Sequence, residues 1–170
     1  MNPFVDSKKR SIDLPFGCKD LGGVPTAGDH QPDFQTRFKS VKGLSEAERH
    51  IASLLLAPGL TFLSIVELPK YQHHLQLGLA RDVLCIFLRV DGSDEGRLQR
   101  IRKFFRDDGI SSIVDCFGGI MNNTTSRILI YPLPVNAPDA AELIVRLLRD
   151  GFAVSEDAEL YFSSSEERIA

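Results

Sequence analysis

The sequence contains little cysteine, and the cysteines it has form no disulfide pattern. Its three cysteines, Cys18, Cys85 and Cys116, are widely spaced and include no C-x-x-C pair. An odd number of scattered thiols is not typical of a small secreted scaffold, and it indicates a reducing compartment. No apolar stretch follows the basic residues near the N-terminus, as a secretory leader would require. We therefore expect a cytoplasmic protein.

Long hydrophobic runs and an excess of one charge are also missing. The longest apolar runs, such as residues 83–88, are far shorter than the roughly 18 to 20 residues of a membrane helix. The 20 Lys and Arg residues stand against 23 Asp and Glu, which gives a formal net charge of −3. No global positive field therefore favours nucleic acid or an anionic membrane. The sequence predicts a soluble chain with no membrane span.

What is present is an ordinary globular composition, with 43% hydrophobic and 25% charged residues in 170. This length suits one core rather than two. Residues 1–43 combine proline and glycine with no lasting apolar period, which predicts an irregular N-terminal arm. The apolar residues of IDLPFGCKDL (residues 12–21) could dock this arm on the domain or on a neighbouring subunit. Residues 44–163 are predicted to form a single α+β domain, and residues 164–170 a flexible tail.

The first regular elements follow the arm. Ser45 and Glu48 match the capping-box pattern, which predicts a helix over residues 46–57. Residues 60–68 are rich in β-formers and predict a strand. The next stretch, residues 70–82, is polar with alternating leucines, and it is compatible with a loop or an edge strand.

From residue 83 the pattern is sharper. Residues 83–90 are almost continuously apolar, as in a central strand that is covered on most of its surface. Asp91 or Ser93 can cap the next helix, whose apolar positions recur at helical spacing and which Gly109 ends. Pro138 opens a later helix that ends at Gly151. The predicted strands around these helices cover residues 110–115, 127–133 and 158–162, with a turn over residues 118–125.

The order from residue 83 is therefore β-α-β-β-α-β. This is the split βαβ, or ferredoxin-like, arrangement: an antiparallel sheet with two helices on one face. The earlier helix and strand would add a fifth strand or a layer on the open face. Such an order describes architecture alone, since many functions share it.

No catalytic residue is expected, and the candidates considered are Asp115 and Cys116, at the end of a predicted strand. A nucleophilic thiol needs a neighbouring cation, an imidazole or a helix N-terminus to lower its pKa. The sequence neighbour is instead an acid, and the histidines are distant. A small buried residue is the favoured interpretation of Cys116.

The segment after Cys116 is rich in turn-forming residues. Gly118 and Gly119 permit positive φ, and Asn122 and Asn123 tolerate the left-handed region, so a chain reversal is predicted. The same segment could present backbone N–H groups to an anion. It precedes a strand rather than a helix, which removes the helix-terminus contribution.

Two further groups have polar chemistry. His73 and His74 are adjacent and are the candidate metal ligands, but no standard ligand spacing accompanies them, so no metal or other cofactor is expected. The second helix carries regularly spaced cations that could bind an anion or nucleic acid, or simply face solvent. These cations are Arg97, Arg100, Lys103 and Arg106, with Arg102 nearby.

Together these patterns favour association over catalysis. The expected function is protein association, by homodimerisation through a sheet edge or helix face or by binding another protein. The alternative is a small-molecule or nucleotide-binding regulatory module. Nucleic-acid binding through residues 97–106, disfavoured by the net charge, and a Cys116-dependent enzyme rank below these two.

Overall fold

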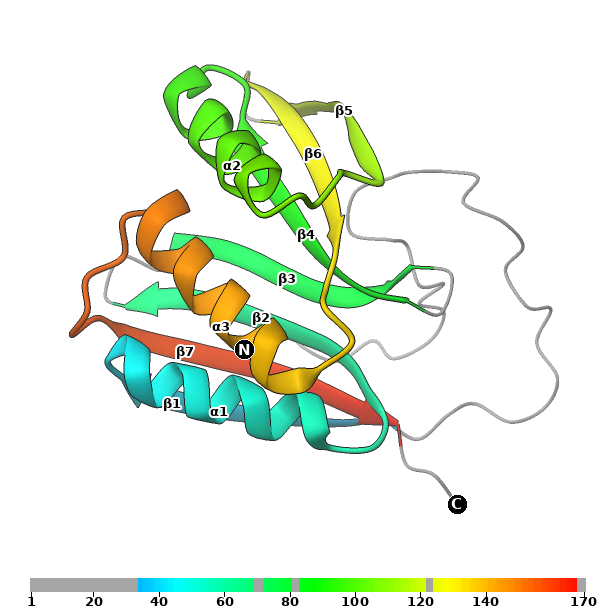
Figure 1. Ribbon diagram of the computed structural model, residues 1–170, viewed down its shortest axis with the longest axis vertical. Helices are drawn as coiled ribbons and strands as arrows, with labels where there is room; N and C mark the ends of the chain where they lie inside the picture. The colour runs from blue at the N-terminus through cyan, green and yellow to red at the C-terminus, as the bar shows by residue number, and fades with distance from the viewer. Residues whose placement is uncertain (1–33, 69–71, 81–82, 122–123, 168–170) are drawn as a thin grey trace, which may run out of the picture.

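A computed structural model describes residues 34–68, 72–80, 83–121 and 124–167 of the chain. Within these ranges the chain is a mixed α+β fold, with one seven-stranded sheet and three helices (Figure 1). The strand order is β1-β7-β2-β3-β4-β6-β5, and all neighbouring strands are antiparallel. The strands are β1 (Phe34–Lys42), β2 (Leu60–Leu68), β3 (Gln72–Ala80), β4 (Val83–Asp91), β5 (Val114–Met121), β6 (Thr124–Pro132) and β7 (Glu159–Glu167).

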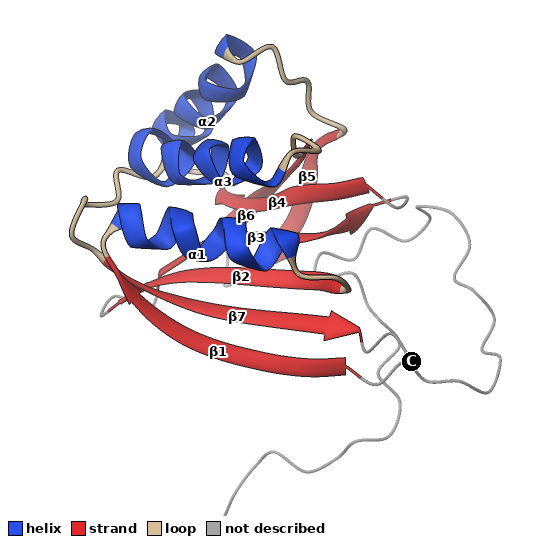
Figure 2. Cartoon of the chain, turned by 60° about the horizontal axis from the view of Figure 1, so that its bottom comes forward, coloured by secondary structure: helices blue, strands red, loops and turns tan. Residues whose placement is uncertain are grey.

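The helices α1 (Leu44–Leu56), α2 (Glu95–Asp107) and α3 (Ala137–Arg146) all lie on one face of the sheet (Figure 2). Each helix is amphipathic, and its apolar side faces the strands in one large core cluster. Phe105 of α2 stacks on Tyr131 of β6, with ring centroids 3.6 Å apart. No helix in the described ranges is long and apolar enough to cross a membrane.

Strand β4 is apolar on both sides, as the sequence predicts. Ile86, Leu88 and Val90 face the helices and belong to the large core cluster. Cys85 and Phe87, which alternate with them, belong to a second cluster on the opposite face. Since successive strand residues point to opposite faces, this continuous apolar run requires cover on both faces of the sheet.

The helix α3 continues into a π-helical turn, η1 (Leu147–Gly151). Leu147 and Leu148 are both fully buried there. Pro138 lies in the first turn of α3, and Gly151 ends η1, as the sequence predicts for both ends. The last turn is therefore wider than an α-helical one and buries two consecutive leucines.

The ferredoxin-like order predicted from residue 83 is not confirmed. Strands β4, β6 and β5 are adjacent as that order requires, but β2 and β3 lie between β4 and β7. The helix before β2 is on the same face as the other two helices, and residues 72–80 form a central strand. The elements before β4 therefore extend the sheet and its single helical layer. The sequence had also allowed them to form a layer on the opposite, open face.

Both ends of the described chain are more regular than predicted. Residues 34–42, expected within the irregular arm, form β1 and pair with β7. Residues 164–167, expected in the flexible tail, belong to β7. The two segments pair with each other, so each supplies the long-range hydrogen bonds that local composition cannot reveal.

The helix N-termini also differ from the predicted caps. The N-cap of α1 is Gly43, without a side-chain hydrogen bond, and the capping box of Ser45 and Glu48 is not formed. In α2 the N-cap is Asp94, whose side chain accepts a hydrogen bond from the backbone N–H of Arg97. The choice of Asp91 or Ser93 was therefore wrong by one to three residues, since Asp91 accepts hydrogen bonds from Ser93 instead.

Candidate functional site

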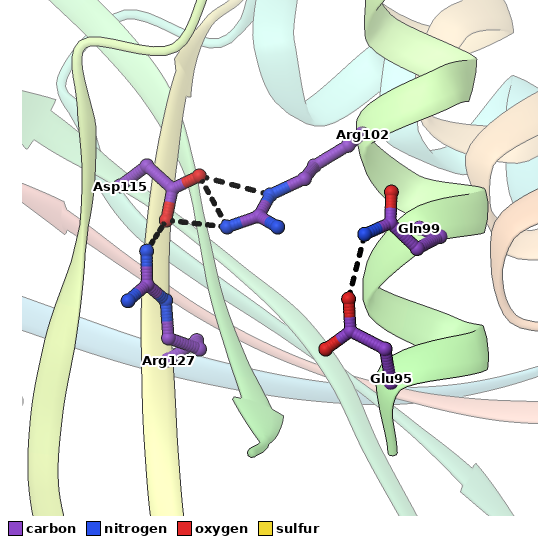
Figure 3. Close-up of polar contacts among 5 residues, drawn as sticks. All are labelled: Glu95, Gln99, Arg102, Asp115 and Arg127. Carbon is purple, nitrogen blue, oxygen red and sulfur yellow. Dashed lines mark hydrogen bonds and ion pairs between the residues drawn. The ribbon is translucent and has the colours of Figure 1, made fainter. Parts of the chain in front are cut away.

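Of the predicted site residues, Asp115 lies where α2 passes beside the edge strand β5. Asp115 of β5 forms ion pairs with Arg102 of α2 and with Arg127 of β6 (Figure 3). Arg102 donates from Nε and Nη2 to the two carboxylate oxygens, each at 2.9 Å. The side chains are 26–34% exposed, so the three groups form a partly buried clamp, here called the Asp115 clamp.

The clamp fixes the charge of Asp115. Partial burial alone would raise the pKa of this carboxyl group, but the hydrogen bonds and positive charges of Arg127 and Arg102 outweigh it, and the pKa lies below its ordinary value. Asp115 is therefore ionised at neutral pH and balanced by two cations. Such an arrangement holds β5 and β6 to α2 and is poorly suited to a general acid or base.

The structure separates Asp115 from Cys116. Adjacent strand residues point to opposite faces, and Asp115 faces α2. Cys116 packs against the second apolar cluster on the helix-free face, where it is opposite Ile128 of β6. The two residues therefore lie on different faces of the sheet, and the catalytic pairing considered from the sequence has no geometric support.

The two glycines lie inside β5 rather than in a turn. They form a β-bulge between Phe117 and Ile120 in the pairing with β6. Gly119 has a φ of +91°, as predicted for a residue that must adopt the left-handed region. Gly118 has a different role, because a Cβ there would lie 2.7 Å from Cγ1 of Ile128 and 2.8 Å from Oγ of Ser126. Asn122 and Asn123 lie outside the described residues.

The cations of α2 are partly neutralised by acids of the same helix and its cap. Arg97 pairs with Asp94 at 3.2 Å, and Lys103 pairs with Asp107. Glu156 and Glu159, acids near the C-terminus, contact Arg149 and Ser40 rather than the cations of α2. Arg100 and Arg106 are exposed on α2. The helix therefore presents a mixed surface rather than a continuous cationic stripe.

The sequence did not single out the apolar residues of this edge. Phe117 is 58% exposed and Ile113, directly before β5, is 52% exposed. Phe117 also contributes to an open cavity of about 460 Å³ beside α2, together with Arg102 and Arg127. The alternation of Ile113, Asp115 and Phe117 was a usable signal, because it places all three on one face of a strand.

The candidate metal ligands lie next to each other on one strand of the sheet. His73 and His74 belong to β3, but their side chains lie outside the part of the chain that is described. Among the residues whose side chains are described, no group of three or more His, Cys, Asp or Glu could hold a metal ion.

Comparison with known proteins adds no relative. No family model matches the chain, and neither the curated proteins nor the solved structures contain a significant match. The residues of the β5 edge are therefore the basis for its functional assignment.

Proposed function

We propose that the chain acts by protein association and forms a homodimer in which two β5 strands pair edge to edge. The observation that carries this proposal is the combination at β5 of an open strand edge with two exposed apolar side chains. Within the described strands, β5 is terminal and pairs with β6 alone. Phe117 and Ile113 are 58% and 52% exposed beside that edge.

A second copy of β5 suits this edge. Two identical strands that pair antiparallel are related by a twofold axis, so one surface satisfies both partners. Asp115 is the one charged residue of the strand VDCFGGIM, and its charge is balanced by the clamp. Two copies therefore approach without like-charge repulsion between their β5 strands. The bulge at Gly118 and Gly119 restricts regular pairing to the part of the strand before it.

The other edge of the sheet is less suited to self-association. Strand β1 carries Arg37, Lys39 and Lys42 in nine residues. Lysines and arginines on an edge strand disfavour pairing with a like strand, because the charges would be brought together and desolvated. Comparison of the two edges therefore favours β5.

Replacement of Phe117 by lysine tests this proposal. We expect the wild-type chain to dimerise in analytical ultracentrifugation and in gel filtration with light scattering. Phe117→Lys removes one partly exposed aromatic side chain from each copy, at about 1 kcal/mol apiece, and should therefore raise the dimer dissociation constant by about thirtyfold.

Phe38→Lys provides the matched control. Phe38 is 62% exposed on β1, so its replacement changes an equally exposed phenylalanine on the opposite edge strand. This variant should dimerise like wild type. A wild-type chain that stays monomeric at all concentrations, or dissociation caused by Phe38→Lys alone, would contradict the assignment.

A second candidate function is the binding of a small anionic ligand in the cavity beside α2. It is favoured by the presence of Arg102, Arg127 and the ring of Phe117 around one cavity. The ring of Phe117 suits stacking on a base, and Arg102 and Arg127 could share their charge between Asp115 and a phosphate, against the opposing carboxylate of Glu95 in the same lining. A thermal-shift screen with nucleotides distinguishes the two functions, since a ligand raises the melting temperature at constant protein concentration whereas dimerisation makes it concentration-dependent.

A further inference from the structure

Strand β1 is the second terminal strand of the sheet, and its side chains are exposed on both faces. Within the described part of the chain it pairs with β7 alone (Figure 2). The five consecutive residues from Thr36 to Ser40 are all exposed, although successive strand residues point to opposite faces. Val41, near the end of the strand, is buried in the core at 4% exposure. The middle of β1 is therefore accessible from both faces.

The backbone of β1 is regular, whereas that of β5 is bulged. β1 and β7 keep one register over their nine described residue pairs. In an antiparallel ladder alternate residues direct their N–H and C=O groups to one neighbour, and the residues between them direct theirs to the other side. β1 therefore presents donors and acceptors at even spacing along about 30 Å of edge. An extended peptide can pair with such an edge as an additional strand.

Two cations on one face of β1 favour an acidic partner strand. Arg37 and Lys39 point to the same side as the buried Val41, which is the helix side, and follow each other at about 7 Å along the strand. Lys39 is exposed, and Arg37 stays 59% exposed although its guanidinium lies 3.4 Å from the carboxylate of Glu166. Opposite charges on facing strands stabilise a pair, and like charges destabilise it. This spacing therefore selects carboxylates at every second residue of an incoming strand.

Between these cations, Phe38 points to the helix-free face. Its side chain is 62% exposed and stacks on Tyr161 of β7, which is itself 36% exposed. A strand added at this edge places a side chain beside Phe38, with the two Cβ atoms about 5 Å apart. An apolar side chain at that position buries the open side of the ring. Phe38 therefore selects an apolar residue between two acidic ones.

We infer that β1 docks an extended segment of a partner protein in which acidic and apolar residues alternate. The carboxylates face Arg37 and Lys39, and an apolar side chain packs on Phe38. A single-stranded nucleic acid also carries regular negative charge, but it has no backbone amides to pair with the strand edge. β1 and β5 are at opposite ends of the sheet, so partner docking at β1 does not require the homodimer.

Fluorescence anisotropy with the full-length chain tests docking at β1. The probe is a labelled nine-residue peptide of alternating glutamate and valine, equal in length to β1. We expect saturable binding that weakens as salt is added, because exposed charge pairs are screened. A control peptide of the same composition, with all glutamates before the valines, should bind at least about tenfold more weakly, since its carboxylates fall on both faces of an added strand. Equal affinities, or no binding of either peptide, would overturn the inference.

Charge reversal identifies the cations that bind the peptide. Arg37→Glu combined with Lys39→Glu should lose the acidic peptide and bind a peptide of alternating lysine and valine instead. Arg100→Glu combined with Arg106→Glu is the matched control, because it changes the net charge equally at two exposed arginines of α2. This control should bind the acidic peptide like wild type. Equal losses in the two variants would assign the binding to net charge and contradict a site at β1.

Hydrogen exchange followed by NMR keeps the test decisive if the reversed variant does not fold. In the wild-type chain, the acidic peptide should slow exchange at the alternate amides of β1 that point away from β7 and leave those of β5 unchanged. Unchanged exchange at β1, slower exchange at β5 instead, or an equal effect of oligothymidine would exclude strand addition by a peptide at β1. Phe117→Lys should bind the peptide like wild type, so a failed docking test and a failed dimerisation test are distinguishable.

Discussion

The two strands at the ends of the sheet carry different chemistry on similar backbones. Strand β1 has Arg37, Lys39 and Lys42, and its exposed Phe38 stacks on Tyr161 of the neighbouring strand at 6.0 Å. Strand β5 has a single acid, and it is held to α2 and β6 by the Asp115 clamp. One edge is therefore protected by charge. The other edge has its charge neutralised and is interrupted by a bulge.

Only the first half of β5 therefore has a regular edge that is free for pairing with another strand. The bulge disturbs the later half of β5, whereas the segment from Val114 to Phe117 keeps a regular register with β6. The stability of β5 in the sheet therefore depends on close packing at its bulge and on the Asp115 clamp. The stability of β1 depends on neither feature. Variants at each edge can test that contrast through stability alone, independently of oligomeric state.

The largest effect is expected at the bulge. Gly118→Ala would place a Cβ within 3 Å of Ile128, whose side chain is buried. We expect the free energy of unfolding to fall by about 1 to 3 kcal/mol, as for overpacked core sites, in urea denaturation monitored by circular dichroism.

Gly119→Ala measures the cost of an unfavourable backbone conformation without the cost of steric crowding that Gly118→Ala adds. A Cβ at Gly119 would meet no other atom within 4 Å, so only the positive φ of +91° opposes alanine. A cost of about 1 kcal/mol is expected. A larger loss for Gly119→Ala than for Gly118→Ala would contradict the close packing of Gly118 against β6.

The second effect concerns the charges behind each edge. Asp115→Ala removes one carboxylate from two partly buried arginines and should lower the free energy of unfolding by about 1 to 2 kcal/mol. At β1, Glu166→Gln removes the partner of Arg37, which is 3.4 Å away and 59% exposed. That change should cost less than about 0.5 kcal/mol in the same assay. Equal losses would remove the distinction between the clamped edge of β5 and the charged edge of β1.

The smallest effect is a difference in pH dependence. The pKa of His50, on α1 near β1, lies below its ordinary value of 6.5 because burial and the charge of Lys39 outweigh Glu46. The unfolded chain therefore takes up the proton first as the pH falls below 6.5, and stability decreases until the pH passes the lower folded pKa. His50→Gln should remove this decrease in thermal melts between these two pH values.

Asp115 titrates in a lower window. Its folded pKa is below the ordinary value of 3.8, so its stabilising contribution is present above 3.8 and is lost as the pH falls through the folded pKa. In Asp115→Ala, the decrease in stability below pH 3.8 should therefore become smaller. The decrease that His50 causes below pH 6.5 should stay unchanged. If one variant removed both pH-dependent decreases in stability, the two edges of the sheet would be coupled.

The sequence allowed the helices and most strands to be predicted, because their apolar periods are local. The central position of β3 could not be predicted, since its alternating leucines are compatible with either an edge or an interior strand. The same limit applies to β1, whose pairing partner lies more than a hundred residues away. Sequence order alone also cannot show that β2 and β3 lie between β4 and β7.

The candidate site was predictable only in part. The motif around Cys116 was recognised, and the structure places this partly buried thiol opposite Ile128. The role of Arg102 was not predicted, because this residue lies outside the regular three-residue spacing of the other cations of the helix. An ion pair between a helix and a strand depends on how the two elements cross, and a linear charge pattern does not contain that information.

The π-helical turn at the end of α3 has a consequence for insertions and deletions. Such a turn accommodates one residue more than an α-helical turn, and here it lets Leu147 and Leu148 both face the core. The wider turn thus absorbs one residue without rotating the residues that follow it. A one-residue deletion within residues 147–151 could therefore be accommodated by a return to α-helical geometry, whereas an insertion would have no further slack in this turn to absorb it.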